Sequence, residues 1–344
     1  MISLRLFFIG LFVAGSAFFL VKENMSTPRI LVLQSYGSDY SWTRDVDIGI
    51  KRILEKENTI SVRWHYMDTK NHPEKHYIKK IAIISKRVID QFKPNVIIAV
   101  DDDAQEYVAK YYNNDPKIKI VFSGVNGTRE QYAFDKANNV TGILERLPAE
   151  GLVDTLRLLS GTERIIKIIH ISDDSETVKL DDVFLHDYNG WKNVQIQPSL
   201  LVRTFNDWKD AIKKGCEVAD YIIISNYRKI YKNKDTEEKA STSEIINWTM
   251  ENSTKPVVGL NTFVYEDGAH LAIATSPYEQ GEVAAEFAVE IIKNKVLPPY
   301  TQTKQFVVGI DERSIIPGGR FANLPKTYLA YALYSRTFRP KPKS

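Results

Sequence analysis

Three consecutive aspartates after a short apolar run constrain the fold of this chain more than any other feature. The run at 96–100 is rich in β-branched residues and too short to span a membrane. Such a run is typical of a strand buried on both faces, as in a parallel sheet covered by helices. Asp101–Asp103 end it, and a helical pattern follows through Tyr111. The sequence therefore predicts a strand, a polar turn and a helix in succession.

The same order of an apolar run followed by polar residues recurs on either side of this stretch. Residues 30–34 lead into Ser35 and Tyr36, and residues 118–122 lead into Ser123 and Asn126. In open α/β sheets, ligands bind outside the carboxyl ends of the strands. We therefore expect the polar side chains at these three strand ends to converge on one site.

Alternating strands and helices fill the first half of the chain, and the pattern then starts again. Strands are expected at 30–34, 62–66, 96–100, 118–126, 140–145, 165–171, 194–200, 221–224, 256–260, 271–274 and 305–310. This order predicts an α/β protein with two doubly wound, Rossmann-like lobes built on parallel sheets. The halves share an architecture without sequence identity, so they are not a sequence repeat.

Charge and cysteine content argue against a nucleic-acid-binding protein and against a protein stabilised by internal disulfides. The net charge is +3, from 46 basic and 43 acidic residues, which is too balanced to indicate a nucleic-acid partner. Cys216 is the only cysteine, so the chain forms no internal disulfide. We interpret it as a small core residue of an amphipathic helix.

The N-terminus differs in kind from the rest of the chain. Arg5 precedes the apolar run 6–21, and small residues at 15–17 offer a cleavage site, which is typical of an export signal. The run continues past that site, so an uncleaved membrane anchor is the alternative. We expect residues 1–27 to be this signal peptide or anchor, and the domain that follows to lie in the periplasm or elsewhere outside the cytoplasmic membrane.

Several short segments, none of them specific alone, occur in a characteristic order between residues 29 and 324. They are Ser35-Tyr36 followed by Tyr40–Thr43, Asp101–Ala104, Val121–Asn126, Thr141–Ile143, Ser276–Gly281 with Ala284-Ala285, Leu297–Pro299 and Ile310–Arg313. In this order they resemble the ABC-transporter substrate-binding family of the periplasmic binding protein type I class. Relatives in that family also serve as sensor domains of bacterial receptors.

The resemblance implies two lobes that are joined by three crossings and that close on a small ligand. The crossings are expected near Ile143, Thr275 and Val308. Lobe 1 would comprise 28–142 and 276–307, and lobe 2 would comprise 143–275 and 308–335, ending in a tail helix. We find no lipoprotein cysteine near the N-terminal run and expect no output domain in this chain, so its route to a membrane partner is left open.

Candidate ligand-binding residues follow the strand ends of both lobes. In lobe 1 they are Tyr36, Tyr40, Trp42, Asp101, Asp102, Ser123 and Asn126; in lobe 2 they are Asp173, Ser175, Thr177, Asn226, Tyr227, Asn261 and Thr262. Aromatic walls with a few polar groups suit a small polar ligand with a flat or apolar part. An acidic residue at a strand end can hold an ammonium group.

Each of these residues also has a structural interpretation. Asp102 or Asp103 can cap the helix that begins near Ala104. Trp42 can fill a gap between its loop and a helix, and the asparagines at 126 and 261 can be turn residues.

Two metal sites are further alternatives. The acidic turn Asp101–Asp103 can bind Mg²⁺, as in receiver or phosphatase folds, but matching Lys and Ser/Thr partners are missing at suitable strand ends. His72 and His76 have the spacing of a metal pair, although a solvated helix face explains them better.

The leading hypothesis is an exported solute-binding protein that captures a small polar ligand between two lobes and delivers it to an ABC permease. The ligand would be amino acid-like, nucleoside-like or a sugar. One alternative is a ligand-sensing periplasmic protein that partners a membrane kinase or cyclase. Another is a Mg-dependent, phosphatase-like enzyme built on Asp101–Asp103. The sequence carries no nucleophile–base motif, so we expect no catalysis and no cofactor.

Overall fold

The computed structural model describes residues 7–9, 11–13, 15–16, 27–161, 164–315, 317–325 and 327–328. Most of the predicted signal peptide or anchor, 1–27, and most of the predicted tail helix up to residue 335 lie outside these residues. Within the described ranges, no helix is both long enough and apolar enough to cross a membrane.

The chain folds into two compact units. Unit 1 consists of Met1–Ile143 and Pro277–Thr301, and unit 2 consists of Leu144–Ser276 and Gln302–Ser344. The chain therefore passes from one unit to the other after Ile143, Ser276 and Thr301.

Unit 1 contains a six-stranded sheet in the order β11-β5-β4-β3-β1-β2. Its strands are β1 (Arg29–Gln34), β2 (Ser61–Tyr66), β3 (Val96–Val100), β4 (Lys119–Val125), β5 (Val140–Leu144) and β11 (Thr301–Gln302). β1 pairs in parallel with β2 and β3, and β3 pairs in parallel with β4. These four strands therefore end at one edge of the sheet.

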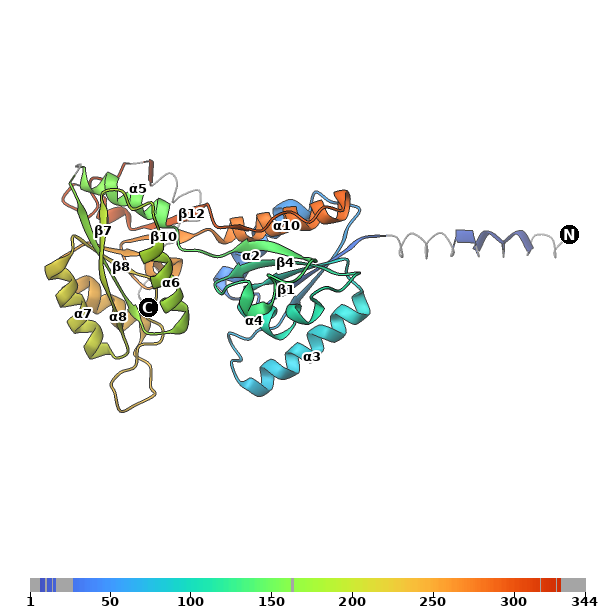
Figure 1. Cartoon of the computed structure of the whole chain (residues 1–344), viewed down its shortest axis with the longest axis horizontal. Helices are drawn as coiled ribbons and strands as arrows, with labels where there is room; N and C mark the ends of the chain where they lie inside the picture. The colour runs from blue at the N-terminus through green and yellow to red at the C-terminus, as the bar shows by residue number, and fades with distance from the viewer. Residues whose placement is uncertain are drawn as a thin grey trace. The chain divides into compact units, whose positions relative to one another are not determined.

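Helices cover both faces of this sheet (Figure 1). They are α2 (Ser41–Leu54), α3 (Lys75–Phe92), α4 (Asp101–Tyr107) and α10 (Pro277–Asn294), with short 3₁₀ turns η1 (Ala109–Tyr112) and η2 (Glu130–Tyr132). Alternate residues of β1 and β3, such as Ile30 and Ile98, pack with α2 and α10 in one apolar cluster. All five residues of β3 are buried, as a strand covered on both faces requires.

Unit 2 contains a second six-stranded sheet, in the order β12-β10-β9-β8-β6-β7. Its strands are β6 (Ile166–Asp173), β7 (Val194–Val202), β8 (Tyr221–Ile224), β9 (Val257–Gly259), β10 (Leu271–Thr275) and β12 (Phe306–Ile310). Its helices are α5 (Ala149–Ser160), α6 (Glu176–Asp187), α7 (Phe205–Val218), α8 (Thr242–Asn252), α9 (Thr262–Glu266) and the 3₁₀ turn η3 (Glu312–Ser314).

The two faces of the unit 2 sheet belong to separate apolar clusters. Ile166 and Ile168 of β6 pack with α5 and α6, whereas Ile169 and Ile171 pack with α7 and α8. Side chains point alternately to the two faces of a strand, so one continuous isoleucine-rich run supplies both clusters.

The predicted class, α/β with two doubly wound lobes, is confirmed. One detail differs, because β12 pairs antiparallel with β10. A parallel neighbour requires a crossover within its own sheet. Between β10 and β12 the chain instead passes through α10 and β11 of unit 1. No crossover within the unit 2 sheet therefore forces β12 to run parallel to β10.

Helices α2 and α10 cross with their backbones in contact. A methyl group on Gly281 would overlap the carbonyl oxygen of Val46 and lie 2.8 Å from the amide nitrogen of Ile50. A methyl group on Gly49 would overlap the carbonyl oxygen of Tyr278. Only glycine fits at this crossing, and both helices thereby reach the same apolar cluster against the sheet.

Gly281→Ala should lower the free energy of unfolding by about 1–3 kcal/mol, because the added methyl group pushes two packed backbones apart. Helix propensity alone predicts the opposite, since alanine is favoured over glycine by about 1 kcal/mol in a helix interior. Denaturant unfolding measures the difference. Glu286→Ala, at an exposed position of the same helix, is the control and should change stability by less than about 0.5 kcal/mol. A stabilised Gly281→Ala protein would contradict the close crossing.

Candidate functional site

The carboxyl ends of β1 and β3 bring together Trp42 and Asp101. The indole Nε1 of Trp42, in the first turn of α2, donates a hydrogen bond of 2.9 Å to Oδ1 of Asp101, at the start of α4. The ring of Trp42 also packs against the apolar cluster between α2, α10 and the sheet. Trp42 therefore fills a gap, as one interpretation predicted, and also orients a carboxyl group.

Asp101 is the buried member of the acidic turn. It is 3% exposed, and its φ of 63° places it in the left-handed region, where Asp is tolerated better than most residues. Gly124 lies opposite, and a methyl group there would be 2.7 Å from Oδ1 of Asp101. The absence of a side chain at Gly124 therefore makes room for the carboxyl group.

The two oxygens of Asp101 differ in their surroundings. Oδ1 accepts from Trp42, whereas Oδ2 is buried and has no hydrogen-bond partner among the residues that the structure describes. Burial, and then the negative charge of Asp102, raise the pKa of Asp101 well above its usual range, against smaller opposing effects of Trp42 and Lys70. The group therefore holds its proton to a higher pH than an exposed aspartate does.

Asp102 bonds to the loop that follows β4. Its Oδ1 accepts from the Tyr132 hydroxyl at 2.7 Å and from the Gly127 amide at 3.3 Å. Its Oδ2 lies 3.4 Å from the amide nitrogen of Asn126. Asp102 and Asn126, both predicted to contact ligand, are thus brought together, and their contact fixes a loop of the protein.

Neither Asp102 nor Asp103 caps α4, so that alternative prediction is wrong. No side chain of the N-cap residue bonds to this helix; instead the Ser35 hydroxyl accepts from the Ala104 amide at 2.7 Å. Oδ2 of Asp103 accepts from the hydroxyl of Thr69 at 2.6 Å. The cap comes from the residue just after β1, far away in sequence, and Asp102 and Asp103 bond to other partners.

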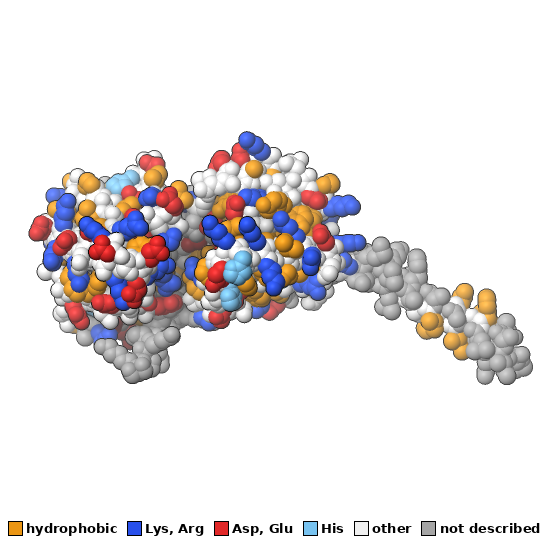
Figure 2. Space-filling model, turned by 90° about the horizontal axis from the view of Figure 1, so that it is seen from below, with side chains coloured by type: hydrophobic (Ala, Val, Ile, Leu, Met, Phe, Trp, Pro, Cys, Tyr) orange, Lys and Arg blue, Asp and Glu red, His pale blue; other side chains and the backbone are white. Residues whose placement is uncertain are grey.

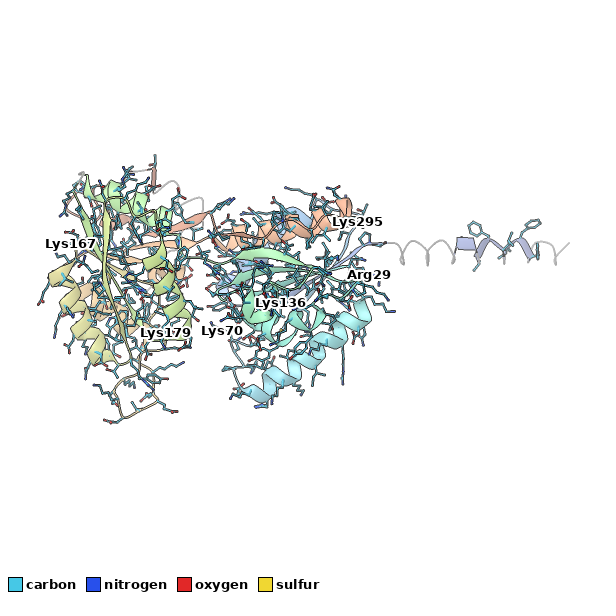
Figure 3. The ribbon with its side chains drawn as sticks, in the orientation of Figure 1. Arg29, Lys70, Lys136, Lys167, Lys179 and Lys295 are labelled. Carbon is cyan, nitrogen blue, oxygen red and sulfur yellow. The ribbon has the colours of Figure 1, made fainter. Side chains whose placement is uncertain are left out.

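Tyr36 and Tyr40 form an aromatic pair at the same edge, with ring centroids 5.4 Å apart in an edge-to-face arrangement. Nζ of Lys70 lies 4.8 Å from the Tyr36 centroid and 5.4 Å from that of Tyr40. Figure 3 labels Lys70 on this side of unit 1. Lys70 was not among the predicted site residues. Residues 67–70 directly follow the expected strand at 62–66, and a position just after a strand end is the same signal by which the other candidates were chosen.

Ser123 lies inside unit 1. It is 0% exposed, and its hydroxyl donates to the carbonyl oxygen of Gln280 in α10 at 2.9 Å. Oε1 of the Gln280 side chain accepts from the Gly124 amide at 2.8 Å. In this structure Ser123 attaches α10 to the end of β4 and does not line a surface.

Asp173, at the end of β6, is fully buried and bonded to backbone. Its Oδ1 accepts from the Ser175 amide at 3.1 Å, and Oδ2 accepts from the Lys229 amide at 3.0 Å. Ser175 is 7% exposed, and its Oγ has no partner among the described residues, whereas Thr177 is exposed on α6. The three predicted residues therefore differ in access to solvent.

Asn226, Asn261 and Thr262 follow β8 and β9 and are partly exposed. Oδ1 of Asn226 accepts from the Arg228 amide at 3.0 Å, and Nδ2 of Asn261 donates to the carbonyl oxygen of Ser225 at 2.8 Å. The Asn226 bond is local to a turn, whereas the Asn261 bond reaches the end of β8, 36 positions away, so it is not the turn contact that was expected for Asn261. Thr262 is the first residue of α9.

Tyr227 is a core residue in this structure. It is 0% exposed, its ring packs edge-to-face with Trp208 and Phe263, and its hydroxyl donates to Oδ2 of Asp267 at 2.6 Å. Its place directly after a strand end suggested a ligand contact. The side chain instead turns into the apolar cluster beside α7, which no local pattern around residue 227 reveals.

A buried histidine network lies beneath the strand ends of unit 2, and sequence reasoning did not anticipate it. Nδ1 of His170 is 2.8 Å from Oδ1 of Asp182, and Nε2 is 2.9 Å from the hydroxyls of both Ser172 and Ser225. These residue types match those of a nucleophilic triad. His170 and both serines are 0% exposed, so no substrate reaches the hydroxyls in this structure.

The acidic turn is not arranged as a metal site. Asp101, Asp102 and Asp103 each contact different protein groups, and no cluster of three or more His, Cys, Asp or Glu side chains in the described ranges is placed to hold a metal ion. Histidine side chains on unit 1 lie among Lys and Arg at the surface in Figure 2. The ring of His72 packs on Tyr77 with centroids 4.5 Å apart.

Comparison with known proteins supports the fold. No protein-family model and no curated protein sequence matches the chain. Among solved structures, it resembles a ligand-free, open substrate-binding protein with adhesive properties from Clostridium difficile (TM-score 0.63, 18% identity, covering 83% of this chain and 92% of that one). It also resembles an ABC domain from Streptococcus pneumonia in complex with L-Trp (0.59, 14%, 89% and 99%).

A third similar structure is an arabinose-binding protein from Geobacillus stearothermophilus (TM-score 0.56, 11% identity, covering 82% of this chain and 97% of that one). At these identities the likeness establishes the fold alone. The chain has the two-lobed α/β fold of the type I periplasmic binding proteins, which the sequence predicted.

Asp101→Asn should stabilise the protein at pH 8 and leave its stability at pH 4 nearly unchanged. Because the folded pKa of Asp101 is raised, the folded state binds more protons than the unfolded state above the unfolded pKa. Wild-type stability therefore falls as pH rises towards the folded pKa, by up to about 1.4 kcal/mol per pH unit. Asparagine does not titrate, and its Oδ1 still accepts from Trp42.

Melting curves of both proteins across this pH range measure the difference. Asp135→Asn, at an exposed position of unit 1, controls for the loss of one negative charge. If Asp101→Asn melted earlier than wild type at pH 8, the protein would stabilise Asp101 as a carboxylate. That result would contradict the raised pKa that burial is expected to give this group.

Proposed function

We propose that this chain is an exported solute-binding protein whose small ligand binds at the strand-end edge of unit 1. The observation that carries the proposal is Oδ2 of Asp101, a buried oxygen without a partner among the described residues, beside an indole that fixes the other oxygen. A buried polar atom without a hydrogen bond is unfavourable by about 1–3 kcal/mol. A ligand that donates to Oδ2 removes that penalty.

The surrounding side chains favour an amine-bearing, amino acid-like ligand. An ammonium group would donate to Oδ2 of Asp101 and, as a nearby opposite charge, would favour the ionised carboxylate. Tyr36, Tyr40 and Trp42 provide flat apolar surface. Lys70, stacked over the two tyrosines, provides a cation that can pair with a ligand carboxylate. Nucleosides and sugars are the other ligand classes to be tested.

The fold supports binding without catalysis. The solved structures above include a complex with L-Trp and an arabinose-binding protein, so this fold accommodates ligands of both chemical types. Delivery to an ABC permease is part of the proposal, and a membrane sensor kinase or cyclase is the alternative partner. Capture of the ligand between two lobes, which the resemblance implies, stays a prediction.

Asp101→Asn should weaken ligand binding by roughly thirtyfold to several-thousandfold, because removing one partner of a buried charged pair costs about 2–5 kcal/mol. A thermal-shift screen of amino acids, nucleosides and sugars identifies a ligand, and calorimetry then measures its affinity. Asp102→Asn is the matched variant: it should melt earlier, because Asp102 holds the loop after β4, with a smaller effect on affinity.

Equal affinities of wild type and Asp101→Asn for every hit would place the ligand site elsewhere. Melting curves recorded beside the calorimetry separate a lost contact from a lost fold. Trp42→Phe keeps an apolar ring and removes the indole donor, so it should reduce affinity less than Asp101→Asn does.

Residues 1–28, with Arg5 before the apolar run 6–21, should direct export of a fused reporter that is active only outside the cytoplasm. Replacing two leucines of the run with arginine should abolish that activity, because the apolar segment is then interrupted by charge. An inactive reporter in the unaltered fusion, with the fusion protein retained in the cytoplasm, would refute the proposed localisation.

A further inference from the structure

Unit 1 has a pocket at the opposite end of its sheet from the acidic turn. It has a volume of about 360 Å³ and lies where β1, β3 and β4 begin and α10 ends. The residues around it are Thr27, Pro28, Asn95, Lys117, Lys119, Ile291, Ile292, Lys295, Val296 and Leu297. Figure 3 labels Arg29 and Lys295 at this end of unit 1 and Lys70 at the other.

The charged residues that line this lysine pocket are all basic. Lys117 and Lys295 are exposed and Lys119 is half-buried. None of the three forms an ion pair with a described residue. Nζ of Lys295 donates to the carbonyl oxygen of Ile292 at 2.8 Å, which places the ammonium group at the end of α10. A pocket lined in this way attracts an anion.

Part of the lining of the lysine pocket is apolar. Ile291 and Ile292 of α10 belong to it, and Val296, just after the helix, is 52% exposed. Lysines around an exposed apolar surface are the combination that binds an anionic lipid, because headgroup and hydrocarbon are then both accommodated.

The chain itself leads from this pocket towards the apolar N-terminal run. Thr27 and Pro28 line the pocket, and the run 6–21 ends at Val21. The six peptide steps from Val21 to Thr27 span at most about 22 Å when fully extended. Phe7, Phe8 and Phe12 within that run are helical and 58–76% exposed. A retained apolar run therefore holds the lysine pocket close to the membrane into which it inserts.

We infer that the lysine pocket docks unit 1 on the anionic headgroups of the membrane that holds the N-terminal apolar run. The inference rests on the anchor form of the proposed localisation. Docking at this end leaves the acidic turn, at the other end of the strands, facing away from the bilayer. Each lysine near an anionic surface strengthens binding on the order of fivefold, so the three together contribute on the order of a hundredfold.

Hydrogen exchange on the full chain, reconstituted in lipid nanodiscs, tests the inference. The amides of 117–119 and 291–297 should exchange more slowly in discs containing anionic phospholipid than in purely zwitterionic discs. This difference should shrink at high salt, which screens the lysines. The triple variant Lys117→Gln, Lys119→Gln, Lys295→Gln should lose it, whereas Lys167→Gln, Lys192→Gln, Lys214→Gln in unit 2 should keep it.

Every other outcome contradicts the docking. Equal protection in both kinds of disc would show that charge is not involved, and protection already present in detergent would show that the chain or a second copy fills the pocket. Failure of the chain to associate with either kind of disc would show that the N-terminal apolar run does not insert into a bilayer, which contradicts the inference. Because reconstitution does not depend on export, these outcomes are distinct from a failure of the reporter fusion.

Discussion

The buried hydroxyl group of Ser35 holds together the strand ends on which the proposed ligand site depends. It donates to the carbonyl oxygen of Val100 at 2.6 Å and accepts from the Ala104 amide at 2.7 Å, while the carbonyl oxygen of Ser35 accepts from the Thr69 amide at 3.0 Å. One residue thus joins the ends of β1 and β3, the start of α4 and the loop after β2. Breaking any of these bonds would leave a buried polar group unpaired. Asp101 is therefore presented by rigid backbone and not by a mobile loop.

Unit 2 uses a serine at the corresponding strand for the same purpose. β6 occupies the place in its sheet that β1 occupies in unit 1, since each lies between the second strand of its unit and the third. Oγ of Ser172 accepts from the Ser225 amide at 3.0 Å and the Asn226 amide at 3.2 Å, which ties β6 to the end of β8. The buried titratable group that bonds to the hydroxyl of this serine is His170, whereas in unit 1 the buried Asp101 directly follows Val100, whose carbonyl oxygen accepts from Ser35. A shared architecture without shared sequence thus includes a shared way of fixing strand ends, with different chemistry attached to each.

The sequence allowed the fold to be predicted because its signals are local. Apolar runs such as 96–100 and 221–224 predicted buried strands, and the acidic turn Asp101–Asp103 marked the end of the strand at 96–100. The hydrogen-bond and packing partners of individual side chains could not be predicted from these local signals, because the partners are distant in the chain. Ser123 bonds to Gln280, 157 positions away, and the hydroxyl that caps α4 belongs to a residue 69 positions before Ala104. Tyr227 turns into the core for a similar reason, since Asp267 and α7 receive it.

The contact between α2 and α10 also sets an order of events during synthesis. The apolar face of α2 emerges early, but the helix that covers the sheet beside it is complete only at Asn294. Domains generally fold as units while the chain is made from its N-terminus. The apolar cluster of unit 1 can therefore be completed only after the continuous segment that forms most of unit 2 has been translated. The two units are therefore completed late and close together along the chain, α10 ending at Asn294 and β12 at Ile310, although unit 1 begins first.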